Sequence, residues 1–230
     1  MGFQDGTNWM DDGPVAKPVI PLGATDDEVC ALLERYRCPV PFHAVRTRLL
    51  GAIASPAMQG APMDTVAELW GGKLPPVESL DAANELIAAL ITGLWNRLAR
   101  HRERSVPFRL TRLEAAATRE GLARLALRRR EGLDGFAEGL FGNCESLDLP
   151  ERAHQAFGVM AQMRSMLEGM HELAENLAKP AEPADIAETL GHLRELTRIA
   201  EREMHAAVLS CARAQRQMMR MLPAASPTRH

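Results

Sequence analysis

The chain has 230 residues, of which 46% are hydrophobic and 25% charged, and its formal net charge is −3. These are ordinary globular values, and they exclude a mainly disordered chain. No apolar run is long enough to span a bilayer, and residues 1–18 have neither the basic start nor the apolar core of a secretory signal. We therefore expect a cytoplasmic protein without a membrane partner.

The composition also favours helices and reduced thiols. Aromatic residues make up only 4% of the chain while methionine reaches twelve, and strands prefer aromatic and β-branched side chains. The four cysteines form no Cys-x-x-Cys pair; they are Cys30, Cys38, Cys144 and Cys211. Such scatter is typical of reduced cytoplasmic thiols and not of a disulfide framework or a zinc site, so no cofactor is expected.

Residues 1–24 are expected to form a flexible segment, and a helical domain is expected over 25–148. A capping box from Thr25 to Glu28 predicts the first helix. Its apolar face is expected to comprise Val29, Leu32, Leu33 and Tyr36. A second helix is predicted over 43–54, a third capped by Asp64 and running to Trp70, and a fourth over 80–102 capped by Ser79.

Pro107 separates the fourth helix from the next one. A second capping box, Thr111 to Glu114, predicts a helix over 114–141 that is interrupted near Gly132 or Gly135. No segment alternates polar and apolar residues in the manner of a strand, and no hairpin dipeptide lies between strand-like runs. The predicted fold class is therefore all-α.

The last third of the chain carries the clearest periodicity. Apolar or small residues recur every three or four positions from Ala153 to Leu177, and again from Ile186 to Met221 beyond Pro180 and Pro183. This spacing predicts an antiparallel helical hairpin over 149–222, followed by a flexible tail over 223–230. The second helix is the longer one, so its end beyond Cys211 needs another surface. We expect a homodimer through these C-terminal helices.

Four short stretches carry a resemblance to a known family. They are LLGAIASP (49–56), AELWGG (67–72), DAANELIAALITGLWNRLA (81–99) and GFAEGLFG (135–142). In this order and spacing they resemble the YecA/YgfB-like family of bacterial helical proteins. The resemblance covers residues 26–142 and extends more weakly to about 212. It implies an all-α, often dimeric fold without an established catalytic site.

The chain departs from this family at two places. Some relatives carry a C-terminal cysteine-histidine metal motif, but no cysteine follows Cys211 here, so the resemblance implies no metal site. The arginine-rich stretch between Pro107 and Gly132 is also longer than the linker usual in the family.

Charge is distributed unevenly along the chain. Residues 97–130 contain eleven arginines and three glutamates, a net of +8, which leaves −11 for the rest. This asymmetry suggests an acidic protein or nucleic acid as a partner, with a candidate surface at Arg124, Arg128, Arg129 and Arg130. Because exposed arginine pairs contribute little, we expect Arg128→Ala, Arg129→Ala and Arg130→Ala together to leave the melting point nearly unchanged and to weaken capture of an acidic partner. Alternatively, the arginines bridge to acids elsewhere, for instance within 26–34 or 168–188.

Catalytic and metal-binding patterns are nearly absent from the sequence. Glu151 with His154, and Glu168 with His171, have the Glu-x-x-His spacing of di-iron bundles, but both pairs lie on one predicted helix. Glu201 and His205 would have to complete a site with Glu168 and His171 across the hairpin. His171 and His205 flank the apolar seam, which favours a solvated role for both. No nucleophile elbow, phosphate loop, dinucleotide fingerprint or zincin motif occurs. We do not expect an enzyme.

These observations predict a non-enzymatic, cytoplasmic helical interaction or adaptor protein that self-associates. The alternative is a nucleic-acid-binding or regulatory module that uses the arginine-rich stretch 97–130. Because Phe108 is the single Phe, Tyr or Trp among these arginines, binding of single strands by base stacking is disfavoured.

Overall fold

The computed structural model describes residues 23–56, 61–144, 146–179 and 182–221, and within these ranges the regular structure is helical throughout. The predicted all-α class is confirmed. Residues 1–22 and 222–230, which hold nearly all of the flexible ends expected from the sequence, lie outside the described residues. The elements in chain order are α1 (Asp26–Arg35), α2 (Phe42–Ala54), α3 (Pro62–Glu68), α4 (Leu80–Ile87), the π-helical η1 (Ala88–Trp95), α5 (Asn96–Ala99), the 3-10 turn η2 (Arg100–Arg102), α6 (Arg119–Phe141), α7 (Glu151–Glu175) and α8 (Pro183–Met221).

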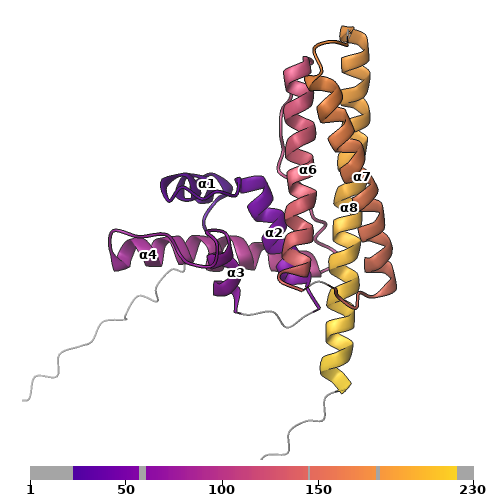
Figure 1. Ribbon diagram of the computed structural model, residues 1–230. Coiled ribbons are helices and arrows are strands. Elements are labelled where there is room, and N and C mark those ends of the chain that lie inside the picture. The colour runs from indigo at the N-terminus through magenta and orange to yellow at the C-terminus, as the bar shows by residue number, and fades with distance from the viewer. Residues whose placement is uncertain (1–22, 57–60, 145, 180–181, 222–230) are drawn as a thin grey trace, which may run out of the picture.

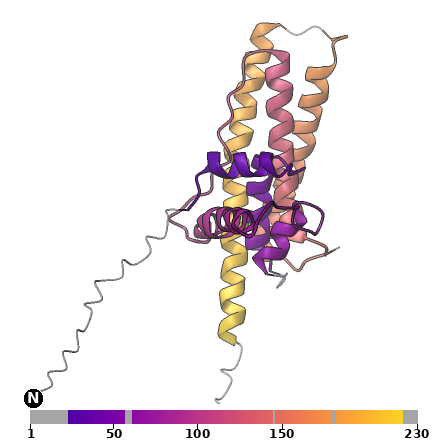
Figure 2. The same ribbon diagram turned by 90° about the vertical axis from the view of Figure 1, so that its left-hand side faces the viewer.

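Three long helices form one part of the molecule, and the shorter helices form the other. Figure 1 shows α6, α7 and α8 side by side, with the chain reversing direction between consecutive helices. In the view turned by 90° the short helices gather around the lower half of this bundle (Figure 2). Helix α2 connects the two parts, because it packs against α6 and α8 of the bundle and against α3 and α5 among the short helices.

The first two helices lie where the sequence predicts them. The capping box at the start of α1 is present: the Glu28 amide donates to Thr25 Oγ1 at 3.3 Å, and the Thr25 amide donates to Glu28 Oε2 at 2.7 Å. The predicted apolar face of α1 is buried as well. Helix α2 begins at Phe42, one residue before the predicted start, and ends at Ala54.

The third and fourth predicted helices differ from the structure in detail. Helix α3 begins at Pro62, so Asp64 lies inside the first turn and accepts a hydrogen bond from the Ala61 amide at 2.9 Å. Proline suits the first helical position because it has no amide hydrogen to leave unpaired there. The predicted helix over 80–102 is divided into α4, η1, α5 and η2, which differ in their backbone hydrogen bonding.

The predicted helix over 114–141 is wrong in its first turn and in its interruption. Helix α6 begins at Arg119, capped by Thr118, whose Oγ1 accepts from the Gly121 amide at 3.1 Å, and it runs unbroken to Phe141. The preceding segment is extended: Phe108 and Leu110 are buried, while Arg109 between them is exposed. Successive side chains of an extended chain point to opposite sides, which anchors this segment in the core and leaves its arginines outside.

Glycines allow α2 and α6 to approach closely. A Cβ added at Gly139 would lie 1.9 Å from the carbonyl oxygen of Arg48, and one added at Gly51 would lie 2.2 Å from that of Phe136. Neither position has room for a side chain without moving a backbone. Gly51 and Gly139 belong to the first and last of the stretches that carry the family resemblance, so these two stretches meet at one helix contact.

The periodic residues of α7 and α8 form the seam of the long bundle. Ala153, Met160 and Leu167 of α7 are buried, as are Leu193 and Met204 of α8. Three predicted seam positions fall outside it: α7 ends at Glu175, so Leu177 is 85% exposed, and Met218 and Met221 at the end of α8 are 51% and 83% exposed. Helix α8 has 39 residues against 25 in α7, and its last turns extend beyond the bundle (Figure 1).

Candidate functional site

A groove of about 1080 Å³ lies between the extended segment 109–115, α6 and α8. We call it the arginine groove, because six arginines from these three elements line it: Arg109, Arg112, Arg129, Arg194, Arg198 and Arg202. The lining includes three glutamates, at positions 114, 195 and 201. The groove therefore carries an excess of positive charge although the whole chain is slightly acidic.

An ionic contact between an exposed arginine and a buried glutamate forms part of the groove lining. Glu201 is only 9% exposed; it accepts from Arg109 Nη1 at 2.7 Å and from the Leu110 amide at 3.0 Å. Arg129 is also 9% exposed and donates through Nη1 to the carbonyl oxygen of Thr111 at 3.0 Å. Its buried Nε has no hydrogen-bond partner in the described structure. Burial lowers the pKa of Arg129 from its ordinary value, while Glu201 acts in the opposite direction.

The arginines of α8 lie along another side of the groove. Arg194, Arg198 and Arg202 follow one another at intervals of four residues and so share one face of the helix. Only Arg198 has an ion pair with a described residue, Glu195 at 2.9 Å, and both partners are well exposed. Concave surfaces lined by charge of one sign concentrate oppositely charged ligands. The groove is thus suited to attract anions.

The four arginines singled out from the sequence do not share one exposed surface. Arg124 and Arg128 are exposed and line a second hollow of about 630 Å³, which Cys30 of α1 and His43 of α2 also line. Arg129 points to the arginine groove, and Arg130 is held in ion pairs between α6 and α7. These residues are nearly consecutive on a helix, so their side chains spread around its axis.

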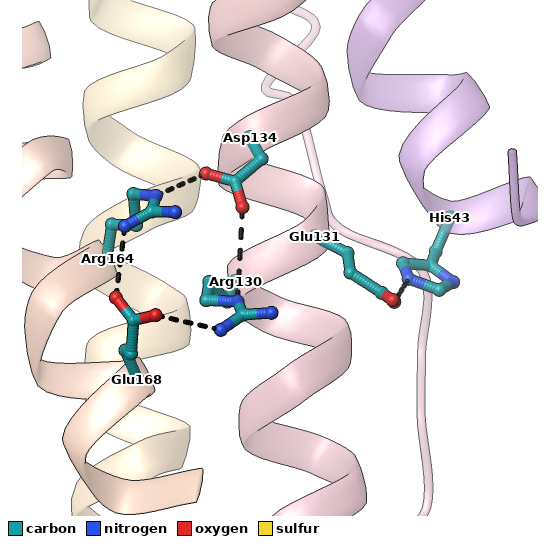
Figure 3. Close-up of polar contacts among 6 residues, drawn as sticks. All are labelled: His43, Arg130, Glu131, Asp134, Arg164 and Glu168. Atoms are coloured by element: carbon teal, nitrogen blue, oxygen red, sulfur yellow. Dashed lines mark hydrogen bonds and ion pairs between the residues drawn. The ribbon is translucent and has the colours of Figure 1, made fainter. Parts of the chain in front are cut away.

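Arg130 belongs to a closed network of two arginines and two carboxylates (Figure 3). Its guanidinium lies 3.1 Å from Glu168 and 4.0 Å from Asp134, while Arg164 lies 2.5 Å from Asp134 and 3.1 Å from Glu168. The network joins α6 to α7. Together with the ion pair between Arg97 and Asp26, it follows the structural alternative, in which arginines of the basic stretch bridge to acids elsewhere.

A histidine–carboxylate contact joins α2 to α6 next to this network. His43 Nε2 lies 2.7 Å from Glu131 Oε2 (Figure 3). Burial lowers the pKa of His43, and the hydrogen bond to Glu131 only partly opposes this effect. The imidazole is therefore held neutral in the folded protein near neutral pH, where it donates to Glu131.

Three of the residues considered for a metal site, Glu168, His171 and Glu201, are engaged elsewhere. Glu168 pairs with Arg130 and Arg164, while His171 Nδ1 lies 3.1 Å from the carbonyl oxygen of Ala123. Glu201 pairs with Arg109, as described above. Among the described residues, no three His, Cys, Asp or Glu side chains converge closely enough to hold a metal ion.

The thiols are poorly suited to nucleophilic chemistry. Burial raises the pKa of Cys211 to about 11. Burial also raises the pKa of Cys38. The pKa of Cys30 is raised by burial and by the nearby Glu34 carboxylate. Because the thiolate is the reactive form, these three cysteines are weak nucleophiles at neutral pH.

A second surface feature lies on the outward side of α7. We call it the outer face of α7, and it comprises the exposed residues Gln155, Gly158, Val159, Ala161, Gln162, Ser165, Met166, Gly169 and Leu173. None of these residues is charged, although the exposed Glu172 lies on the same side of the helix, next to Leu173. The charged residues of α7 between positions 155 and 170, Arg164 and Glu168, are on the side that faces α6. Met166 and Leu173 are each 54% exposed.

Sequence reasoning missed both surfaces, although each left a signal. Arg194, Arg198 and Arg202 stand at helical spacing, and Val159, Met166 and Leu173 are seven residues apart. The structure adds that Arg112 and Arg129 of the basic stretch lie beside the α8 arginines.

Comparisons with known proteins identify no relative: no protein-family model, curated protein or solved structure matches this chain. The helices within the described ranges are too short or too polar to cross a membrane.

Proposed function

We propose that this chain is a cytoplasmic, non-enzymatic helical interaction protein that self-associates through its C-terminal helices. The observation that carries this proposal is the uncharged, partly apolar outer face of α7. The paired Arg164 and Glu168 and the unreactive thiols support the non-enzymatic part, because they leave few groups free for catalysis. The thiols of Cys30, Cys38 and Cys211, which lie outside any disulfide, support a reducing compartment.

The outer face of α7 has a composition that an isolated surface helix does not need. Charged residues make up a quarter of the chain, and the exposed side of α8 carries Glu188, Arg194 and Arg198. On α7, by contrast, the uncharged exposed residues extend from Gln155 to Gly169, about 21 Å along the helix axis. Depletion of charge around exposed apolar side chains is typical of the centre of a protein interface.

Two glycines on this face have no role within the chain. A Cβ added at Gly158 or Gly169 would meet nothing within 4 Å, unlike those in the contact between α2 and α6. Glycine inside a helix costs about 1 kcal/mol relative to alanine. Together with Ala161 and Ser165, these small residues would allow a second helix to approach closely, which supports a helix of a partner as the contact.

A second copy of the same face is the partner that this composition fits best. A two-fold axis brings each residue near its own counterpart, so a charged face would meet like charges, whereas an uncharged face would not. The exposed Met218, Met219 and Met221 at the end of α8 offer further apolar contact area. Methionine side chains adapt to irregular surfaces.

Sedimentation of the full chain at tens of micromolar tests this proposal. We expect a dimer for the natural sequence and a monomer after Val159→Glu combined with Met166→Glu. Leu80→Glu is the matched control, because Leu80 is 77% exposed on α4, away from α7. A monomeric natural chain, or a double variant that dimerises as well as the control, would refute the proposal.

The resemblance to the YecA/YgfB-like family also stays a proposal. It is supported by the contact between the stretches 49–56 and 135–142. Gly51 in the first stretch and Gly139 in the last both lack a side chain where α2 and α6 pack closely. Trp70, in the second stretch, donates through Nε1 to the carbonyl oxygen of Tyr36 at 3.0 Å and so joins α1 to α3.

A second candidate function is a regulatory module that binds an anionic partner, supported by the arginine groove. Several arginines of 97–130 are used inside the fold: Arg97 pairs with Asp26, Arg109 with Glu201, and Arg130 with Glu168. The charge available to a nucleic acid is therefore smaller than the sequence suggests. A gel shift at low salt tests nucleic-acid binding, and the absence of a shift would remove that form of the function.

A further inference from the structure

We propose that the arginine groove binds a compact anion carrying two or more phosphate groups, such as a free polyphosphate or the phosphate chain of a nucleotide. This inference rests on the second candidate function and specifies its ligand; it does not depend on self-association. It uses Arg194, Arg198 and Arg202 of α8, which lie outside the basic stretch.

The charges that line the groove are not balanced within it. Of the three glutamates, Glu201 is used by Arg109 and Glu195 by Arg198. Arg112, Arg194 and Arg202 make no ion pair with any residue in the described part of the chain. Six guanidinium groups against three carboxylates leave an excess of three positive charges. Since one phosphate monoester carries about −1.5 to −2 at neutral pH, two phosphates match this excess.

Arg129 gives the groove a fixed positive charge. Its side chain is nine-tenths buried, and its position is set by the hydrogen bond from Nη1 to the Thr111 carbonyl oxygen at 3.0 Å. Its Nε remains without a partner in the described structure. A buried guanidinium is costly unless negative charge lies nearby. Glu201 supplies part of that charge, but it is also paired with Arg109, so a bound anion would add to the compensation.

The shape of the groove favours a small ligand over a nucleic acid chain. Its volume of about 1080 Å³ is close to that of small-molecule sites. The uncharged lining residues are Leu113, Ala115, Leu125 and Thr197, so the groove offers no aromatic ring on which a base could stack.

Arginine alone supplies the positive charge of the groove, and this favours phosphate. The planar guanidinium donates two parallel hydrogen bonds to phosphate oxygens. Arg194, Arg198 and Arg202 rise by about 6 Å from one to the next along α8, so a single phosphate could not reach all three. A ligand with several linked phosphates could. An acidic peptide would need separate carboxylates placed at the same spacing and is the competing ligand in the test.

Calorimetry on the full chain at low salt tests the inference. The probes are inorganic tripolyphosphate, orthophosphate, ATP, a single-stranded oligonucleotide and a glutamate-rich peptide. Tripolyphosphate and ATP are expected to bind more tightly than the other three, and comparison of the two distinguishes a free polyphosphate from a nucleotide. Arg194→Gln with Arg202→Gln should weaken their binding by about tenfold for each arginine removed.

The matched control is Arg124→Gln with Arg128→Gln, which removes the same charge from exposed positions outside the groove. This control should leave the affinity almost unchanged. An equal loss in both double variants would overturn the inference, because binding would then follow net charge. Tighter binding of the oligonucleotide or the peptide would also overturn it while leaving the second candidate function intact. Failure of every probe would overturn both.

Discussion

We expect Gly139→Ala to destabilise the protein, because the added methyl group disturbs the contact between α2 and α6. The added Cβ would lie 1.9 Å from the carbonyl oxygen of Arg48 and 2.9 Å from the amide nitrogen of Ala52. Both atoms belong to the backbone of α2, so no side chain can rotate away to make room. Helices α2 and α6 must instead move apart, and this disturbs the contact that connects the short helices to the long bundle.

The magnitude follows from two opposing effects. Overpacking a tight core typically costs about 1–3 kcal/mol, and a clash with backbone belongs at the upper end or beyond. Alanine recovers about 1 kcal/mol through its higher helix propensity. The net loss should therefore be about 2 kcal/mol or more, which for a chain of this size lowers the Tm by roughly 4–8 °C.

Thermal and urea unfolding followed by circular dichroism measure this loss. Gly191→Ala is the matched control: Gly191 lies in the interior of α8, and a Cβ there would meet nothing within 4 Å. The control should gain stability by up to about 1 kcal/mol, since only helix propensity changes. A Gly139→Ala protein as stable as the natural chain would show that the close contact between α2 and α6 is wrong.

Three further predictions concern single side chains. Burial holds the pKa of His43 below its ordinary value of 6.5, so the unfolded chain binds more protons at this residue than the folded one. The free energy of unfolding should therefore fall as the pH is lowered from 7 to 5, and urea titrations should show a shallower fall for His43→Gln. Arg129→Ala should cost about 1–3 kcal/mol because it leaves the Thr111 carbonyl without its donor, whereas the exposed Arg128→Ala should stay within about 0.5 kcal/mol in the same assay. Cys211, with a pKa of about 11, should resist a thiol reagent at pH 8 until the protein is unfolded, as peptide mapping would detect.

The structure also alters the stability that we expect for the triple variant Arg128→Ala, Arg129→Ala and Arg130→Ala. From sequence, their joint loss is expected to leave the stability nearly unchanged. The structure buries Arg129 and places Arg130 between Asp134 and Glu168. The triple variant should therefore be clearly destabilised, and it would not isolate a binding surface.

Sequence reasoning succeeded where the determinants are local. The capping box of α1 involves Thr25 and Glu28, three residues apart, so no distant part of the chain is needed to form it. The seam of α7 and α8 was equally readable, because a sustained spacing of three and four residues leaves one apolar side. Both signals are carried by neighbours in the sequence.

The start of α6 shows why a local signal can fail. Thr111 and Glu114 fit a capping box, but Phe108 and Leu110 are buried by packing against distant helices, and this requires an extended backbone. Thr118 then provides the cap instead, seven residues, or about two turns, later in the chain. Tertiary burial outweighed a capping preference, whose contribution is only about 1 kcal/mol.

The candidate groove could not be predicted for the same reason. Its arginines come from positions near 110, near 129 and near 200, and only the folded bundle brings them together. Sequence clustering directed attention to Arg124, Arg128, Arg129 and Arg130, yet consecutive residues on a helix point in different directions. Proximity in sequence was therefore a poor guide to a shared surface.

The fate of the basic stretch connects the charge asymmetry to the proposed ligand. Arg97, Arg109 and Arg130 are each matched by a carboxylate from another element, so much of the +8 of residues 97–130 is neutralised inside the fold. Such pairs add little net stability when exposed, but they fix which helices meet. Among the described residues, Arg112 of the basic stretch stays unpaired in the groove. Arg194 and Arg202 of α8, which lie outside the stretch, add two more unpaired positive charges beside it. A fold that only needed to neutralise its arginines would not gather further unpaired ones from another helix at the same groove, and this is the reason to look for an anion there.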